Sequence, residues 1–140
     1  MDKRKYTEMV MQALKSTYFN NSANASTEYL KGECRLLSFL KIDPERKYQP
    51  GELAKELGLT TARIASILKT LEKKGYILRE CSPEDKRKVF VEITENGKEY
   101  IDKKRENACL FFDGAFEKLS EEESEQFIAI LNKLTTDKYI

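Results

Sequence analysis

A glycine at position 58, between two amphipathic helical segments, constrains the fold of this chain more than any other feature. The first segment begins at the Pro50-Gly51 pair, and the second runs to about Lys74. Gly58 can adopt the positive backbone φ of a tight turn without steric cost, and Ala54 is small enough for the two helices to cross closely. This spacing predicts a helix-turn-helix, with Thr60 or Thr61 as the cap of the second helix.

Apolar residues follow helical spacing through both segments and predict the core between them. They are Leu53, Leu57, Leu59, Ile64, Ile67, Leu68 and Leu71. An ordinary helical hairpin that is packed only for stability would show the same pattern. The other side of the second helix favours entry into a DNA groove, because it is small or basic and Glu72 is the only acidic residue in 60–74. The candidate DNA-binding residues on this helix are Thr61, Ala62, Arg63, Ser66, Lys69, Thr70 and Lys73.

Two strand-like runs follow Gly75, at Tyr76–Cys81 and Lys88–Ile93, and predict a hairpin with a polar loop at 82–87. Lys86 and Arg87 in this loop fit the narrow, negative minor groove of DNA, and Asp85 is placed to orient Arg87 through a charge-assisted bond. Taken alone, the loop also fits a solvated hairpin tip. Directly after a helix-turn-helix it predicts a wing.

Further helices are expected on both sides of this unit. The first runs from about Lys3 to Phe19, the stretch Asn20–Ser26 interrupts it, and a second, capped by Ser26 or Thr27, continues through Leu40 to a stop at Asp43-Pro44. After the hairpin, Thr94 caps a helix from Glu95 to about Glu117, and a Ser120/Glu123 capping box opens the last helix. We expect buried residues at Leu30, Leu36, Leu37 and Leu40, and inward-facing residues at Phe127, Ile130, Leu131 and Leu134.

The composition excludes several classes of function. The chain has no histidine, which removes Ser-His-Asp catalysis and most zinc sites, and it has no glycine-rich phosphate loop. The acidic run 121–125 is better explained as a helix N-terminus than as an acid/base pair. Its three cysteines do not have disulfide-framework spacing, and no run approaches about 20 apolar residues. We expect a cytoplasmic protein that is not an enzyme, has no membrane segment and binds neither a cofactor nor a metal.

Charge is distributed unevenly along the chain. Residues 60–105 carry 12 basic and 8 acidic side chains, whereas residues 106–140 carry 3 basic and 8 acidic ones. A basic middle segment favours an anionic partner such as nucleic acid, although an ordinary solvated mixture of charges is equally compatible with these counts.

Four stretches together resemble the MarR family of bacterial transcription regulators. They are Gly51–Leu59, Leu71–Ile77, Asp85-Lys86-Arg87 and Ile93–Gly97, the last with Ile93 in the place of the usual leucine. The resemblance implies a mainly α-helical fold with a small β-hairpin wing. It implies one MarR-type domain over 1–140, in which residues 29–95 form the winged helix-turn-helix lobe and residues 1–28 and 96–140 form a helical dimerisation region.

The resemblance also implies a function. A protein of this family binds double-stranded DNA as a homodimer at a pseudo-palindromic site, most often as a repressor, and a small-molecule effector releases it. Arg63, Ser66 and Lys69 would then face the groove, and Arg87 would enter the minor groove. The candidates for the dimer seam are Tyr6, Met9, Phe111, Phe112, Phe116, Tyr139 and Ile140, about half of which would equally fit the core of one chain.

Two questions stay open at this point. The main alternative function is a winged-helix module that binds protein and not DNA, against which the acid-poor face of 61–73 argues. The effector is not encoded in any motif. Oxidant sensing by Cys34 and Cys109 is a further hypothesis, and the alternative is the more common structural use of buried cysteine.

Overall fold

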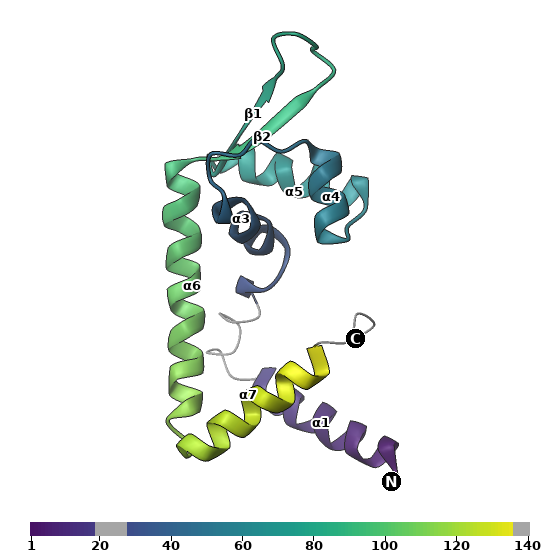
Figure 1. Ribbon diagram of the computed structural model, residues 1–140, viewed down its shortest axis with the longest axis vertical. Helices are drawn as coiled ribbons and strands as arrows, with labels where there is room; N and C mark the ends of the chain where they lie inside the picture. Colours follow the sequence, from purple (N-terminus) through teal and green to yellow (C-terminus); the bar gives the residue numbers. More distant parts are fainter. Residues whose placement is uncertain (19–27, 136–140) are drawn as a thin grey trace.

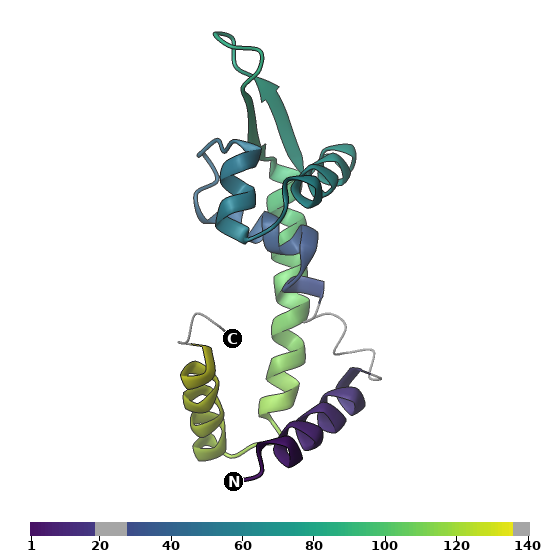
Figure 2. The same cartoon turned by 90° about the vertical axis from the view of Figure 1, so that its right-hand side faces the viewer.

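A long helix, α6 (Glu95–Phe116), joins the two ends of the molecule (Figure 1). The computed structural model describes the backbone of residues 1–18 and 28–135 and the side chains of 1–15 and 28–135. At one end of α6 lies a lobe of α3 (Gly32–Ile42), α4 (Pro50–Leu57), α5 (Thr61–Lys73), β1 (Ile77–Cys81) and β2 (Val89–Ile93). At the other end, α7 (Glu121–Thr135) and α1 (Lys3–Tyr18) spread away from the helix (Figure 2). The predicted class, mainly α-helical with one β-hairpin, is confirmed.

One apolar core holds the lobe together. Its fully buried side chains are Leu36, Leu37, Leu40, Leu53, Ile64, Leu68, Leu71, Ile77, Ile101 and Val91. They come from α3, α4, α5, both strands and α6, and burial of each such side chain contributes about 1.5–3 kcal/mol. The core therefore fixes α5 and the hairpin to the first turns of α6 as one body.

The helix predicted to run through Leu40 is interrupted at residues 30 and 31, after helical residues 28 and 29. The part after this interruption, α3, starts at Gly32, whose φ is +50°, after an extended Lys31 that provides no side-chain cap. Leu30 therefore lies outside the helix and is 63% exposed, so the prediction that it is buried is wrong. The predicted caps Ser26 and Thr27, like Phe19, lie outside the described residues. The helix ends at Ile42, before the predicted stop at Asp43-Pro44.

The hairpin pairs antiparallel with Ile77 opposite Ile93 and Cys81 opposite Val89. Each strand starts one residue later than predicted, because the preceding N–H is used elsewhere. The N–H of Tyr76 donates to the carbonyl oxygen of Leu71 at 3.0 Å, which closes the end of α5, and that of Lys88 donates to the carbonyl oxygen of Asp85 within the loop at 3.0 Å.

The base of the hairpin is also tied to the loop before α4. The N–H of Tyr48 donates to the carbonyl oxygen of Val91 at 3.0 Å, and the N–H of Val91 donates back at 2.7 Å. The Tyr48 ring is buried against Phe39, with ring centroids 5.3 Å apart. The position of the wing is therefore set from both sides of β2.

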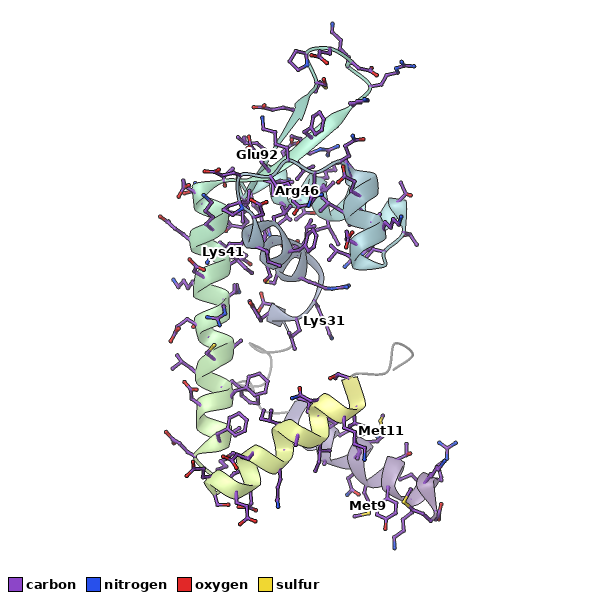
Figure 3. All side chains as sticks on the ribbon, in the orientation of Figure 1. Met9, Met11, Lys31, Lys41, Arg46 and Glu92 are labelled. Carbon is purple, nitrogen blue, oxygen red and sulfur yellow. The ribbon has the colours of Figure 1, made fainter. Side chains whose placement is uncertain are left out.

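The far end of the molecule differs from the expectation of an inward-facing last helix. None of the described residues of α7 is buried, and its apolar positions Phe127, Ile130, Leu131 and Leu134 are 43–60% exposed. That prediction is wrong for the single chain, because α7 turns away from the side of α6 (Figure 1). The apolar residues of α1 are equally open, and Figure 3 shows Met9 and Met11 projecting from that helix. Of the predicted seam, Phe112 is 40% exposed, while Tyr139 and Ile140 lie outside the described residues.

No helix in the described ranges combines the length and apolar character that crossing a membrane requires.

Candidate nucleic-acid interface

The α4–turn–α5 unit has the geometry predicted from its glycine and threonine. Gly58 has φ +64° and ψ +34°, and the N–H of Leu59 donates to the carbonyl oxygen of Ala54 at 2.9 Å. Thr60, one of the two predicted caps, accepts a hydrogen bond from the N–H of Arg63 at 3.1 Å. The turn is therefore stabilised on both sides, and α5 begins with a defined orientation.

Four of the predicted DNA-binding residues on α5 lie along one line. Ala62, Ser66, Lys69 and Lys73 are spaced by four, three and four residues, so they share the side of the helix opposite the buried Ile64, Ile67, Leu68 and Leu71. All four are exposed, as is Thr61 at the first helical position. We call the residues 62, 66, 69 and 73 the outer line of α5.

Two further candidates lie on a flank of α5 and not on the outer line. Arg63 is exposed, but its guanidinium leans toward the start of α3, since a Cβ on Gly32 would lie 3.6 Å from its Nη2 atom. Thr70, seven residues later on the same flank, is half-buried, and its hydroxyl donates to the carbonyl oxygen of Ser66 at 3.1 Å. The helix thus separates the seven predicted residues into an outer line, a flank and the terminal Thr61.

The tip of the wing holds the predicted Asp85–Arg87 pair. Oδ1 of Asp85 accepts from the backbone N–H of Arg87 at 3.0 Å and from its Nε at 3.2 Å. The Arg87 side chain is 92% exposed, so its two terminal nitrogens project from the loop while the base of the guanidinium is held. Lys86 beside it is also exposed. The contact predicted for Asp85 is present; what Arg87 touches beyond the protein stays a prediction.

The charges of this surface are largely uncompensated within the described part of the chain. None of its ion pairs includes Arg63, Lys69, Lys73 or Lys86. Lys74, at the end of α5, is bound instead to Glu33 of α3 at 3.0 Å, and this hydrogen bond raises the pKa of the lysine. The outer line and the wing tip therefore present positive charge toward solvent, as an interface for an anionic polymer requires.

Hydrogen bonds at a junction between α5, β2 and α6 connect this surface to the start of the long helix. The hydroxyl of Thr94 donates to the carbonyl oxygen of Gly75 at 2.7 Å and accepts from the N–H of Gly97 at 3.0 Å. Gly97 is buried, and a Cβ there would overlap the carbonyl oxygen of Tyr76. Thr94 was predicted only as a helix cap. Its second hydrogen bond, to the carbonyl oxygen of Gly75, also connects the Ile93–Gly97 motif to the end of α5.

A polar cluster surrounds the buried Cys34 behind this junction. Tyr76 and Tyr100 stack with centroids 4.2 Å apart, and Lys104 reaches Glu28 at 2.8 Å. Burial raises the pKa of the Cys34 thiol, so the group stays protonated at neutral pH and reacts poorly with oxidants. This argues against Cys34 as a redox sensor. Cys81, on the wing, is exposed, and Cys109 is half-buried.

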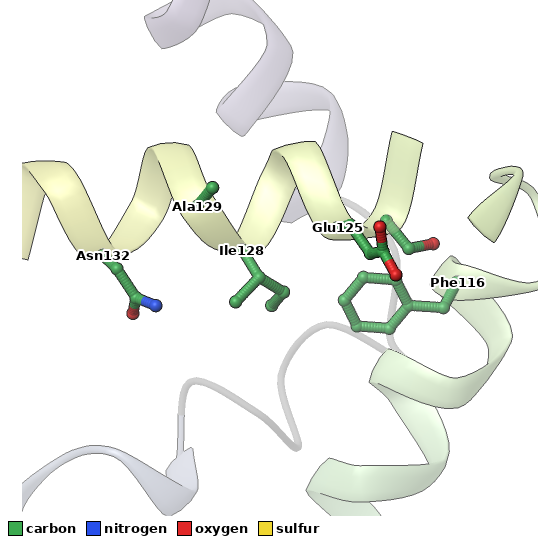
Figure 4. Close-up of a pocket in the computed structure, with 6 residues that line it drawn as sticks. Phe116, Glu125, Ile128, Ala129 and Asn132 are labelled. Atoms are coloured by element: carbon green, nitrogen blue, oxygen red, sulfur yellow. The ribbon is translucent and has the colours of Figure 1, made fainter. Parts of the chain in front are cut away.

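A polar and an apolar hollow lie away from the predicted DNA-binding residues, and no sequence motif predicted either. A polar cavity of about 280 Å³ between α3 and α6 is lined by Tyr29, Ser38, Lys41, Ile101, Asp102 and Arg105. Lys41, which is labelled in Figure 3, pairs with Asp102. The side-chain oxygen of Ser38 is buried without a hydrogen-bond partner among the described atoms. An apolar groove of about 590 Å³ follows α7, where Ile128 lies on the same side of the helix as the ring of Phe116 of α6 (Figure 4).

No cluster of three or more potential metal ligands occurs in residues that the structure describes.

The helix-turn-helix and the wing are similar to those of known proteins. The model of the MarR family matches residues 39–89, which span the end of α3, the helix-turn-helix, β1 and the loop of the wing. The chain is 34% identical over 101 residues to the HTH-type transcriptional regulator YkoM of Bacillus subtilis, covering 72% of this chain and 64% of YkoM. It is 30% identical over 104 residues to the HTH-type transcriptional repressor YetL of Bacillus subtilis, covering 74% of this chain and 62% of YetL. The matches thus span less than two thirds of the length of either relative.

Among solved structures, the fold is similar to that of a mutant of S. aureus MepR bound to an oligodeoxyribonucleotide. The TM-score is 0.62 at 20% identity, and the match covers 97% of each chain. This likeness concerns the fold alone. The family model and the two relatives support one conclusion: residues 39–89 of this chain match the MarR family.

Proposed function

We propose that the protein is a sequence-specific, DNA-binding transcription regulator. The observation that carries the proposal is the pairing of two surfaces on one rigid lobe: the outer line of α5 and the wing tip around Arg87. Both present cations that no described carboxylate neutralises, apart from the Asp85 contact that orients Arg87. The relatives YkoM and YetL are HTH-type regulators, and the MepR mutant of similar fold is bound to DNA, which supports the same assignment.

In the proposed complex, α5 lies in the major groove. Its outer line is narrow enough at Ala62 and Ser66 for close approach, and Lys69 and Lys73 reach base edges or phosphates. Arg87 enters the adjacent minor groove, where a narrow channel of negative potential favours a guanidinium. Asp85 limits the orientations that Arg87 samples, which lowers the entropy lost on binding.

We propose further that the protein acts as a homodimer on a pseudo-palindromic site. Support comes from the exposed apolar side chains of α1 and α7 and from the groove beside Phe116, because clustered exposed apolar side chains mark interaction surfaces. A second copy of the chain would cover the same surfaces on both partners. Residues 1–28 and 96–140 would then form the dimerisation region and residues 29–95 the DNA-binding lobe.

Repression follows most simply from occupation of a promoter, and YetL, a relative, is a repressor. We propose that a small-molecule effector releases the protein from DNA. The effector would bind in the polar cavity between α3 and α6, because this cavity lies where the DNA-binding lobe meets the long helix. Lys41 and Arg105 against Asp102 give the cavity an excess of positive charge, which favours a small anion.

The test is selection from a library of genomic DNA fragments with the full-length protein at physiological salt, followed by sequencing of the bound fragments. We expect enrichment of a few sites with two inverted half-sites about one helical turn apart, and an affinity that falls steeply with salt. No enrichment, or binding that salt does not weaken, would contradict the proposal. It would favour the alternative, a winged-helix module that binds protein.

A further inference from the structure

The side chain of Arg63 does not follow the outer line of α5. Its Nη2 atom lies 3.6 Å from the position that a Cβ would take on Gly32, at the start of α3. The residues opposite the core are Ala62 and Ser66, one turn apart, and Arg63 lies beside them on the flank that α3 adjoins. The guanidinium is therefore at the edge of the α5 surface.

The acidic groups near that edge are already bound to other cations. Glu33, the residue after Gly32, holds the ammonium of Lys74 at 3.0 Å, and Glu28 holds that of Lys104 at 2.8 Å. Arg63 enters none of the ion pairs formed by the described residues. Its charge is exposed and available to an external anion.

The dimensions of DNA give the flank a different role from the outer line. An α-helix with its side chains is about 10–12 Å across, and the major groove is about 12 Å wide, so a helix fills the groove from wall to wall. The line opposite the core meets the base edges on the floor of the groove. The flanks meet the walls, which are made of sugar and phosphate.

From this geometry we infer that Arg63 binds a DNA phosphate on the groove wall and does not read a base. This inference rests on the proposed function and changes the role that the sequence alone predicts for Arg63. Base recognition then belongs to the outer line, to Ser66 and Lys69 above all. Arg63 supplies affinity that is the same on every sequence.

The experiment compares R63A with K69A, a matched removal of one cation from the same helix. Both are exposed, and the cap of α5 uses the backbone N–H of Arg63 and not its side chain, so both variants should fold. The probes are the duplex that the wild-type protein selects from a randomised library, its single-base variants, and a scrambled duplex of the same composition. Fluorescence anisotropy gives the Kd for each across a range of KCl concentrations.

We expect R63A to weaken binding to the selected and scrambled duplexes by the same factor, about tenfold, and to lower the log–log salt slope by about one per protomer. R63K should restore the slope. K69A should instead reduce the ratio of Kd values between the selected duplex and its variants at one base pair. A neutral methylphosphonate placed at one backbone position should weaken the wild-type protein and leave R63A unchanged.

Two results would overturn the inference. One is a loss of preference at a particular base pair in R63A, which would make Arg63 a base reader. The other is wild-type affinity and slope in R63A, which would remove it from the interface. If the wild-type protein selects no duplex at all, the proposed function itself fails, whereas selection by the wild type with either result for R63A overturns only this assignment.

Discussion

At the scale of single residues, the Asp85–Arg87 pair makes a prediction with an unusual sign. Removing an acidic residue from a DNA-binding surface ordinarily strengthens binding, because it removes a repulsion from phosphate. Here Asp85 holds the backbone N–H and the Nε of Arg87. We therefore expect Asp85→Ala to weaken DNA binding by up to about fivefold, as exposed ion pairs contribute about 0.2–1 kcal/mol.

The control for this prediction is the same substitution in an Arg87→Ala background. There the effect of Asp85→Ala should vanish or reverse, because no arginine remains to be positioned. Tighter binding by the single Asp85→Ala variant, measured by anisotropy, would show that the pair does not orient the wing arginine.

Two glycines of α6 predict opposite effects on stability. Gly97 is buried where an added Cβ would overlap the Tyr76 carbonyl oxygen and lie 2.9 Å from Cγ1 of Ile93. Gly97→Ala should therefore lower the free energy of unfolding by about 1–3 kcal/mol, since the backbone at the junction has to move. Gly114→Ala, which meets nothing within 4 Å in the described structure, should raise it by up to about 1 kcal/mol through helix propensity.

Urea unfolding of the two variants beside the wild-type protein measures both changes. Equal effects of the two substitutions would mean that the close approach at Gly97 does not limit the junction. The Gly97 position could be predicted from the Ile93–Gly97 motif alone, but its reason could not. The reason is a contact with Tyr76, which lies on the far side of the hairpin in sequence.

At the scale of elements, the helix ends were the most predictable features. Thr60, Thr94 and the Ser120/Glu123 pair all form the caps expected of them, because a cap depends on residues within one turn. The start of α3 was mispredicted for the opposite reason. It begins at a positive-φ glycine after an uncapped Lys31, and no local hydrogen-bonding residue marks that position.

The capping box of α7 makes a pH-dependent prediction. Glu123 accepts a hydrogen bond from the backbone N–H of Ser120 at 3.0 Å, and its pairing with Ser120 lowers the pKa of the carboxyl group. A lowered pKa in the folded state means a stabilisation that is present above the unfolded value, near 4.5, and lost as pH falls through the folded value. Glu123→Gln should therefore be less stable than the wild type at pH 7 and equally stable well below about pH 4.

Thermal unfolding of both proteins from about pH 3 to pH 7 tests this convergence. Glu122→Gln is the control, because it removes the same charge from the first turn of α7 without touching the Ser120–Glu123 pair. A difference between Glu123→Gln and the wild type that stays constant across the range would rule out a contribution from the ionised cap.

At the scale of the whole molecule, the open apolar face of α1 and α7 is the feature that the sequence alone did not place. Helical periodicity predicts which side chains of α7 are apolar, but it does not say whether they pack within one chain or between two. In the single chain, Phe127 and Leu131 are more than 40% exposed. The lobe, by contrast, could be predicted in detail, because its core lies between elements that are consecutive in sequence.

The proposed dimer predicts the effect of a charge on that face. Leu131→Glu should convert a dimer into a monomer, because a buried carboxylate without a partner is costly to desolvate. Sedimentation velocity at micromolar concentration measures the change. Lys55→Glu, at an exposed position of α4 outside the proposed dimerisation region, is the control that should leave the dimer intact. A wild-type protein that sediments as a monomer would remove the basis for a two-fold binding site.

The central claim is that the lobe of α5 and the wing binds DNA through its unneutralised cations. Its most direct test is the salt dependence of binding to the selected duplex for the wild-type protein, Arg87→Ala and Lys118→Ala. Lys118→Ala is the control, because it removes a cation that follows the far end of α6. We predict a steep negative log–log slope for the wild type and for Lys118→Ala, and a slope smaller by about one per protomer for Arg87→Ala. A wild-type slope near zero, or one that Arg87→Ala leaves unchanged, would contradict the account.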